Sequence, residues 1–84
     1  MRKVKKEITS ANILEVGIEH NGYQGGDAGH SGFVKISFMN IASTAMYLNG
    51  KEVEHFEFEF KGDSERDTLI DSLEFILDEL KNNK

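Results

Sequence analysis

The sequence contains no cysteine, no proline and no long run of apolar residues. Without cysteine, neither a disulfide framework nor a thiolate zinc site can form. No stretch reaches the roughly 18 to 20 apolar residues that a membrane-spanning helix needs. The basic start MRKVKK continues into EITSAN, so it lacks the apolar core of a signal peptide. These absences favour a cytoplasmic protein without a membrane partner, stabilised by packing and by association of copies rather than by disulfides.

Acidic residues outnumber basic ones in the second part of the chain. Residues 1–50 carry five Lys or Arg and four Asp or Glu, whereas residues 51–84 carry five and eleven. A protein that binds duplex DNA or RNA must neutralise phosphates, so this acidic region argues against such a partner. Residues 1–6 are basic and are interpreted as either a solvated tail or an edge strand that lysines protect from aggregation.

Three segments alternate between apolar and polar residues with the period of two that marks a half-buried strand. They are residues 14–19, 33–40 and 55–60. Before the last of them, Asn49 and Gly50 suit a type I′ turn and predict a hairpin. Val53 is out of phase with the phenylalanines that follow, which predicts a bulge at residues 54–55. Gly17 falls on the outer face and indicates a bulge or the close approach of another chain segment.

The C-terminal segment is predicted to form an amphipathic helix over residues 63–81, with Asp63 or Ser64 as its cap. Its apolar stripe consists of Leu69, Leu73, Ile76, Leu77 and Leu80. A helix of this kind and several half-buried strands bury each other's apolar faces. The expected fold is therefore α+β: an antiparallel sheet of four to five strands, with the helix stripe packed on its apolar face.

The length of 84 residues corresponds to a single small domain, residues 1–84, whose limited core gains stability from association. A homo-oligomer is therefore expected. Phe75 projects opposite the apolar stripe and is the predicted contact with a second subunit.

The segment NGYQGGDAGHSG, residues 21–32, holds five of the eight glycines and connects two predicted strands. Long ordered loops in small domains tend to carry function. We interpret this loop as a recognition element that supplies directional hydrogen bonds, an aromatic contact and backbone donors. The predicted ligand- or partner-binding residues are Tyr23, Gly25, Gly26, Asp27 and His30.

Other chemistries remain as alternatives for this loop. His20, Asp27 and His30 would serve a small metal-dependent or hydrolytic enzyme, although their spacing matches no established zinc pattern. Adjacent glycines in the loop would allow backbone donors to converge on a phosphate, but no helix N-terminus follows them. Ala28 stands where a serine-protease loop would have its nucleophilic serine, so serine-protease activity of this loop is not expected. No cofactor is expected.

The run LEVGIEHNGYQGGDAGHSG, together with STAMYLNG and DTLIDSLEFILDEL, resembles a group of small uncharacterised proteins of Gram-positive bacteria and their phages or mobile elements. That group shares a G-G-D-x-G-H-x-G core after a strand and has no established activity. The resemblance implies action by binding, such as inhibition of a host defence protein or sequestration of a signalling nucleotide. The leading hypothesis is therefore a small non-enzymatic binding module, and a nucleotide-sequestering protein is an alternative.

Overall fold

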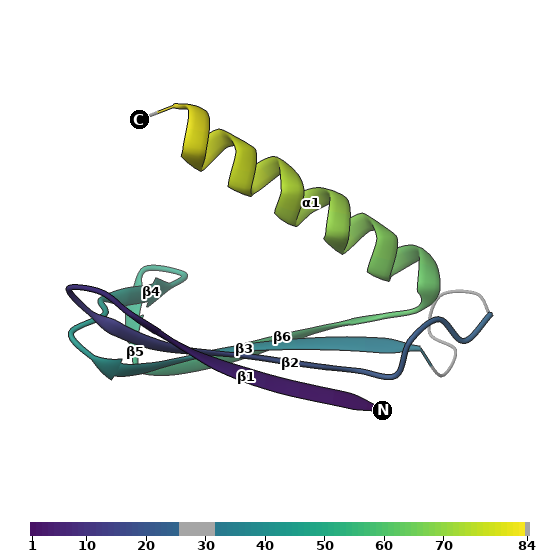
Figure 1. Ribbon diagram of the computed structural model, residues 1–84, viewed down its shortest axis with the longest axis horizontal. Coiled ribbons are helices and arrows are strands. Elements are labelled where there is room, and N and C mark those ends of the chain that lie inside the picture. The colour runs from purple at the N-terminus through teal and green to yellow at the C-terminus, as the bar shows by residue number, and fades with distance from the viewer. Residues whose placement is uncertain (26–31, 84) are drawn as a thin grey trace.

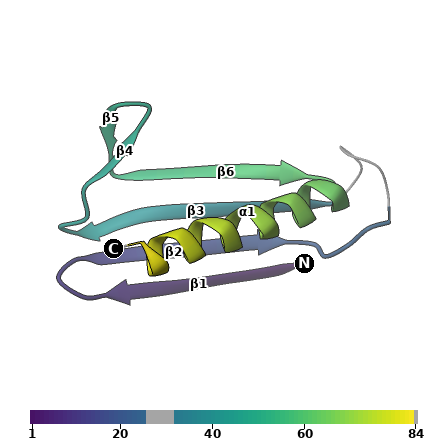
Figure 2. The same ribbon diagram turned by 90° about the horizontal axis from the view of Figure 1, so that it is seen from above.

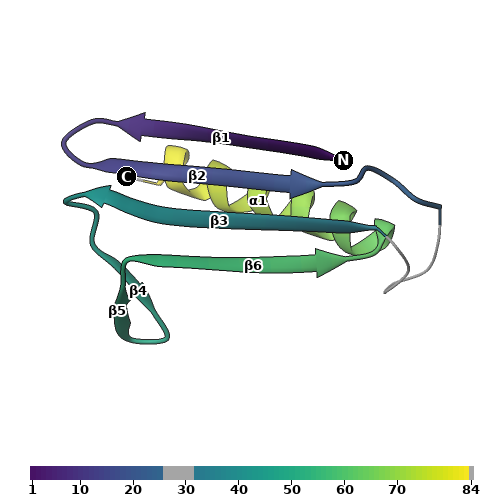
Figure 3. The same ribbon diagram turned by 90° about the horizontal axis from the view of Figure 1, so that it is seen from below.

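The computed structural model describes residues 1–25 and 32–83 and has an α+β architecture. A four-stranded antiparallel sheet in the order β1-β2-β3-β6 carries the C-terminal helix α1 on one side (Figure 1). A small two-stranded sheet of β4 and β5 lies beside one end of β6 (Figures 2 and 3). The elements in chain order are β1 (Arg2–Thr9), β2 (Ile13–His20), β3 (Phe33–Ala42), β4 (Met46–Leu48), β5 (Lys51–Val53), β6 (His55–Lys61) and α1 (Asp63–Asn82). The predicted fold class is confirmed.

The core lies between the start of α1 and the middle of the sheet. Val34 and Ile36 of β3 and Leu69 of α1 are the buried hydrophobic residues among those the structure describes. The aromatic residues packed against them are Phe38, Phe58 and Phe60. The alternation in sequence thus becomes one apolar face, because directly paired residues of antiparallel strands share a face.

The first residues form the edge strand β1 rather than a tail. All eight residues of β1 are exposed, and the strand pairs with β2 on one side. Lysines along an open edge oppose pairing with another sheet, which fits the second of the two sequence interpretations.

The hairpin at Asn49 and Gly50 is present, and both residues have positive φ, 52° and 82°, as a type I′ turn requires. At Glu54 the chain passes from the small sheet into the main one, so a break between sheets replaces the bulge expected there. The main-chain N–H of Asn40 donates to the Glu54 carbonyl at 2.7 Å and fixes this crossing. At Gly17 the strand pairing continues without a shift.

The helix begins at Asp63, as predicted, but the residue at its N-cap differs from the prediction. The N-cap is Gly62, with φ of 109°, and no side chain caps the helix. The expected capping by Asp63 or Ser64 is therefore wrong. The carboxylate of Asp63 turns instead to main-chain donors outside the helix, which are described with the candidate site.

The expectation that the whole stripe of α1 packs on the sheet is also wrong. Leu69 is buried, but the exposed fraction of the stripe rises to 44% at Leu73 and 72% at Leu80. Figure 1 shows the reason: the axis of α1 diverges from the sheet toward the C-terminus. Within the described ranges, no helix combines the length and apolar character needed to cross a bilayer.

Candidate functional site

The first part of the glycine-rich loop is bound to the start of α1. The two carboxylate oxygens of Asp63 accept hydrogen bonds from the main-chain N–H of Gln24 at 2.9 Å and of Gly25 at 2.7 Å. A carboxylate at the N-terminus of a helix is favoured by the helix dipole. Asp63 therefore links the loop to the helix. It occupies two main-chain N–H groups that could otherwise bind an external anion.

Tyr23 adds a second link to the same helix. Its hydroxyl donates a hydrogen bond of 2.5 Å to Asp67, and the guanidinium of Arg66 lies 4.5 Å from the centre of its ring. The hydrogen bond to Asp67 is the main cause that raises the pKa of Tyr23 above its ordinary value of 10.0. The side chain remains 56% exposed, so one region of the ring is open to a partner.

His20, at the end of β2, is also engaged. Its Nδ1 accepts a hydrogen bond from the N–H of Gly22 at 3.2 Å and lies 3.1 Å from a guanidinium nitrogen of Arg66. Because N–H groups and guanidinium only donate, Nδ1 acts as the acceptor and the ring proton lies on Nε2. The Nδ1 atom of His20 is therefore already engaged by Gly22 and Arg66.

A side-chain bridge joins the two ends of the loop. The amide oxygen of Asn21 accepts a hydrogen bond of 2.9 Å from the main-chain N–H of Phe33, the first residue of β3. The N–H of Gly62 donates to the carbonyl of Gly32 at 2.9 Å, which brings the start of α1 to the same point. Both ends of the loop are therefore hydrogen-bonded at the same end of the sheet.

The structure brings some of the predicted site residues together. Tyr23 and Gly25 both contact α1, and His20 lies beside them through Arg66. Three further predicted residues, Gly26, Asp27 and His30, fall outside the described residues. Phe75 is 67% exposed, and it lines the outer side of α1 away from the loop.

Sequence reasoning missed three residues of this junction: Asp63, Arg66 and Asp67. It assigned Asp63 to the helix cap and Asp67 to a capping-box position three residues after Ser64, and it gave Arg66 no role. Their spacing of three and four residues, which places them on one side of a helix, was the available signal. What the spacing does not show is that the loop lies against that side.

The opposite face of the sheet is polar and has paired charges. One row of directly paired residues alternates in sign across all four strands: Lys3, Glu19, Lys35 and Glu59. Opposite charges in neighbouring strands stabilise a sheet modestly. The balanced signs fit the solvated face that the alternation of Phe and Glu in β6 predicts, rather than a docking surface for a basic partner.

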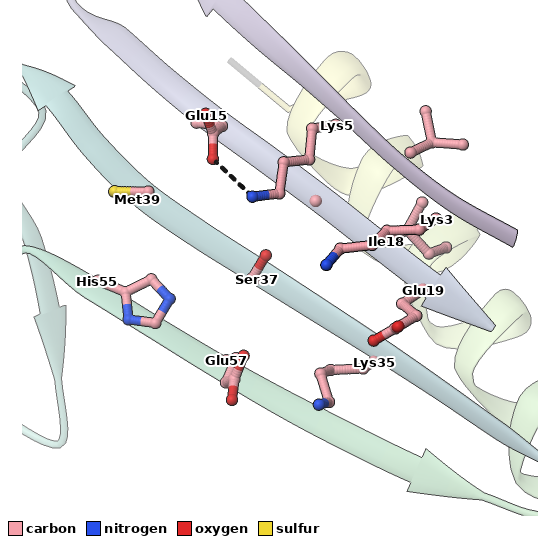
Figure 4. A pocket seen from close by; sticks show the side chains of 12 residues that line it. Lys3, Lys5, Glu15, Ile18, Glu19, Lys35, Ser37, Met39, His55 and Glu57 are labelled. Atoms are coloured by element: carbon pink, nitrogen blue, oxygen red, sulfur yellow. Dashed lines mark ion pairs between the residues drawn. The ribbon is translucent and has the colours of Figure 1, made fainter.

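Next to that row the same face is hollowed (Figure 4). Gly17, which has no side chain, pairs directly with Ser37, whose side chain is small, and a hollow of about 190 Å³ remains between lysine and glutamate side chains. A Cβ at Gly17 would lie 2.6 Å from the Ser37 hydroxyl oxygen, so the close approach expected at this glycine is that of β3. Lys5 and Glu15 form an ion pair at 3.7 Å on its rim.

Comparisons of the chain with protein-family models, with curated proteins and with solved structures yield no match. By its fold and its site, the chain is a small α+β protein in which the first part of a glycine-rich loop is hydrogen-bonded to the start of a helix. The function is argued below from these residues.

The raised pKa of Tyr23 leads to a prediction at alkaline pH. Because the folded state favours the neutral phenol, this stabilisation is fully present below pH 10 and is lost as the pH rises through the raised pKa. We expect tyrosinate absorbance, followed in a Tyr47→Phe background, to show a midpoint above 10.0. In the further variant Asp67→Asn the midpoint should fall, and an unchanged midpoint would contradict the contact.

Proposed function

We propose that this chain is a non-enzymatic binding protein whose recognition surface is the loop of residues 21–32 together with the first turns of α1. The observation that carries this proposal is the pair of hydrogen bonds from the Gln24 and Gly25 amides to the Asp63 carboxylate. Residues 21–25, which are held by the sheet and by the helix, have less conformational freedom to lose when they bind a partner.

The charge of this surface indicates the chemistry of the partner. The loop contributes Asp27, and the first turns of α1 contribute Asp63, Glu65 and Asp67 against the single cation Arg66. The exposed ring of Tyr23 adds apolar contact area with little side-chain entropy to lose. We therefore propose a basic segment of a protein as the partner.

The nucleotide-sequestering alternative has less support. A phosphate at this loop would compete with the Asp63 carboxylate for the N–H of Gly25, and the Asp67 carboxylate lies beside Tyr23. Repulsion between these carboxylates and a phosphate disfavours such a complex.

The alternative of a metal-dependent or hydrolytic enzyme depends on His20 together with Asp27 and His30, and the latter two fall outside the described residues. In residues 1–25 and 32–83, no three His, Asp or Glu side chains gather as metal ligands would. His20 directs its Nδ1 at the Gly22 amide and Arg66 rather than at other ligands. We further propose that binding takes place in the cytoplasm, and that the resemblance to proteins of phages and mobile elements points to a host protein as the target.

A random-peptide library displayed on phage tests the proposed surface against the purified full chain. We expect the selected peptides to be rich in Lys and Arg, and to bind at least about tenfold more weakly to the double variant Asp27→Ala/His30→Ala. Tyr23→Ala should also weaken binding, whereas its matched control Tyr47→Ala, on β4, should not. Affinity should fall as salt is added, since exposed charges are screened.

Two outcomes would decide against this function. Equal affinity of the selected peptides for the wild type and the folded loop variants would remove the loop's role. Shifts of the Gln24 and Gly25 amide signals on titration with inorganic phosphate would instead favour the nucleotide alternative.

A further inference from the structure

The C-terminal two thirds of α1 leave an apolar surface uncovered. Exposure along the stripe increases from 6% at Leu69 to 72% at Leu80. Ile76 and Leu77, between them, are exposed as well. Exposed apolar residues that are contiguous on one side of a helix indicate an interaction surface.

The sheet has a matching uncovered region. Val4, Ile8 and Ile18 lie on the face that carries the helix, yet all three are exposed. They belong to β1 and β2, whereas α1 packs mainly on β6 and β3. We call the two exposed apolar sets, on α1 and on β1–β2, the wedge surface.

The wedge surface continues the core of the domain. A cavity of about 110 Å³ lies between the sheet and the second turn of α1. It is lined mainly by apolar side chains, which include Ile18, Val34, Ile36, Leu69, Ile70 and Leu73. Filling such space and covering the exposed stripe would add apolar burial at roughly 25 cal/mol per Å².

The charges of β1 and α1 indicate which molecule covers the wedge surface. Of the four basic residues of β1, Lys3 and Lys5 lie on the opposite face and two remain on the wedge side, whereas α1 has seven acidic residues and two basic ones. Arg2 and Lys6 alternate with Val4 and Ile8 on the wedge side of β1. One chain therefore carries both an acidic apolar helix and a basic apolar strand.

A surface with both complementary parts on one chain suits a twofold dimer, in which each part meets the other part of the second copy. From Leu73 to Leu80 the exposed stripe of α1 spans about 10 Å at 1.5 Å per residue. From Val4 to Ile8 the exposed apolar part of β1 spans about 13 Å at 3.3 Å per residue. The lengths of the two parts are therefore similar.

We propose that two copies of this chain associate through the wedge surface, with the stripe of each α1 covering Val4, Ile8 and Ile18 of its partner. In this arrangement the acids beside the stripe, such as Glu74 and Glu79, lie near Arg2 and Lys6 of β1. This interface differs from the one predicted from Phe75, which lies on the outer side of the helix.

Light scattering on the full chain after size exclusion tests the association. We expect a mass of twice 9.5 kDa at high concentration and dissociation on dilution. Leu80→Asp should weaken the dimer at least tenfold while the circular dichroism spectrum stays unchanged, because Leu80 is not part of the core. Phe75→Ser, the matched control on the other side of α1, should leave the dimer intact.

A charge swap locates the contact and covers the case in which Leu80→Asp does not fold. Lys6→Glu and Glu79→Lys should each weaken self-association, and mixing the two variants should restore it in part. A monomer at all concentrations, an unaltered Leu80→Asp dimer or a dimer lost with Phe75→Ser would each overturn the proposal. None of these measurements involves the loop, so failure here leaves the proposed recognition surface untouched.

Discussion

Replacing Leu69 with alanine is expected to lower the free energy of unfolding by about 2 to 5 kcal/mol, the usual range for a buried leucine. Leu69 is the one buried residue of the described part of α1, and it packs against Val34 and Ile36. Small domains have only about 5 kcal/mol or somewhat more in total. The variant should therefore lose a large share of its stability and unfold at a markedly lower urea concentration than the wild type.

Urea denaturation followed by circular dichroism measures this effect at a fixed protein concentration, which keeps any contribution from association constant. The matched control is Phe75→Ala, which removes a larger apolar side chain from the exposed side of the same helix. Its cost should remain below about 1 kcal/mol. If the two variants were equally stable, the helix would not be anchored at Leu69.

Asp63→Ala is expected to release the loop from the helix. The substitution removes the acceptor for two main-chain N–H groups, those of Gln24 and Gly25. Hydrogen bonds to charged groups are worth about 1.5 to 3 kcal/mol, and solvent reduces this value at an accessible site. We expect hydrogen exchange of these two amides to become at least about tenfold faster.

Hydrogen exchange read by nuclear magnetic resonance resolves the two amides individually. Asp71→Ala is the matched control, because Asp71 is an acid of the same helix that lies on the outer side beside Phe75. Exchange at Gln24 and Gly25 should be the same in this control as in the wild type. Unchanged exchange in Asp63→Ala would show that the loop does not depend on the carboxylate.

Asp63 and the exposed part of the apolar stripe lie at opposite ends of α1. Asp63 acts where α1 begins, at the end of the sheet that carries the loop, whereas the wedge surface opens toward the C-terminus (Figure 1). Leu69 lies between them and anchors the helix for both. Variants at either end should therefore separate recognition by the loop from association of two copies.

The sequence determined the local elements of this protein. Alternation in residues 33–40 and 55–60, the Asn49-Gly50 turn and the helical stripe each reflect backbone geometry over a few neighbouring residues. Such patterns can be recognised without knowledge of the rest of the chain. The α+β class followed, because a one-sided helix and one-sided strands bury their apolar faces together.

Only the tertiary structure decided which residues of these elements contact one another. The angle at which α1 leaves Gly62 exposes Leu80 and buries Leu69, although both belong to one stripe. Asp63 binds the loop rather than capping its own helix, because Gly62 holds the N-cap position and the N–H groups of Gln24 and Gly25, 39 and 38 positions away, lie within hydrogen-bond distance. Partners so distant in sequence depend on strand register and helix direction, which long-range packing sets and local periodicity does not.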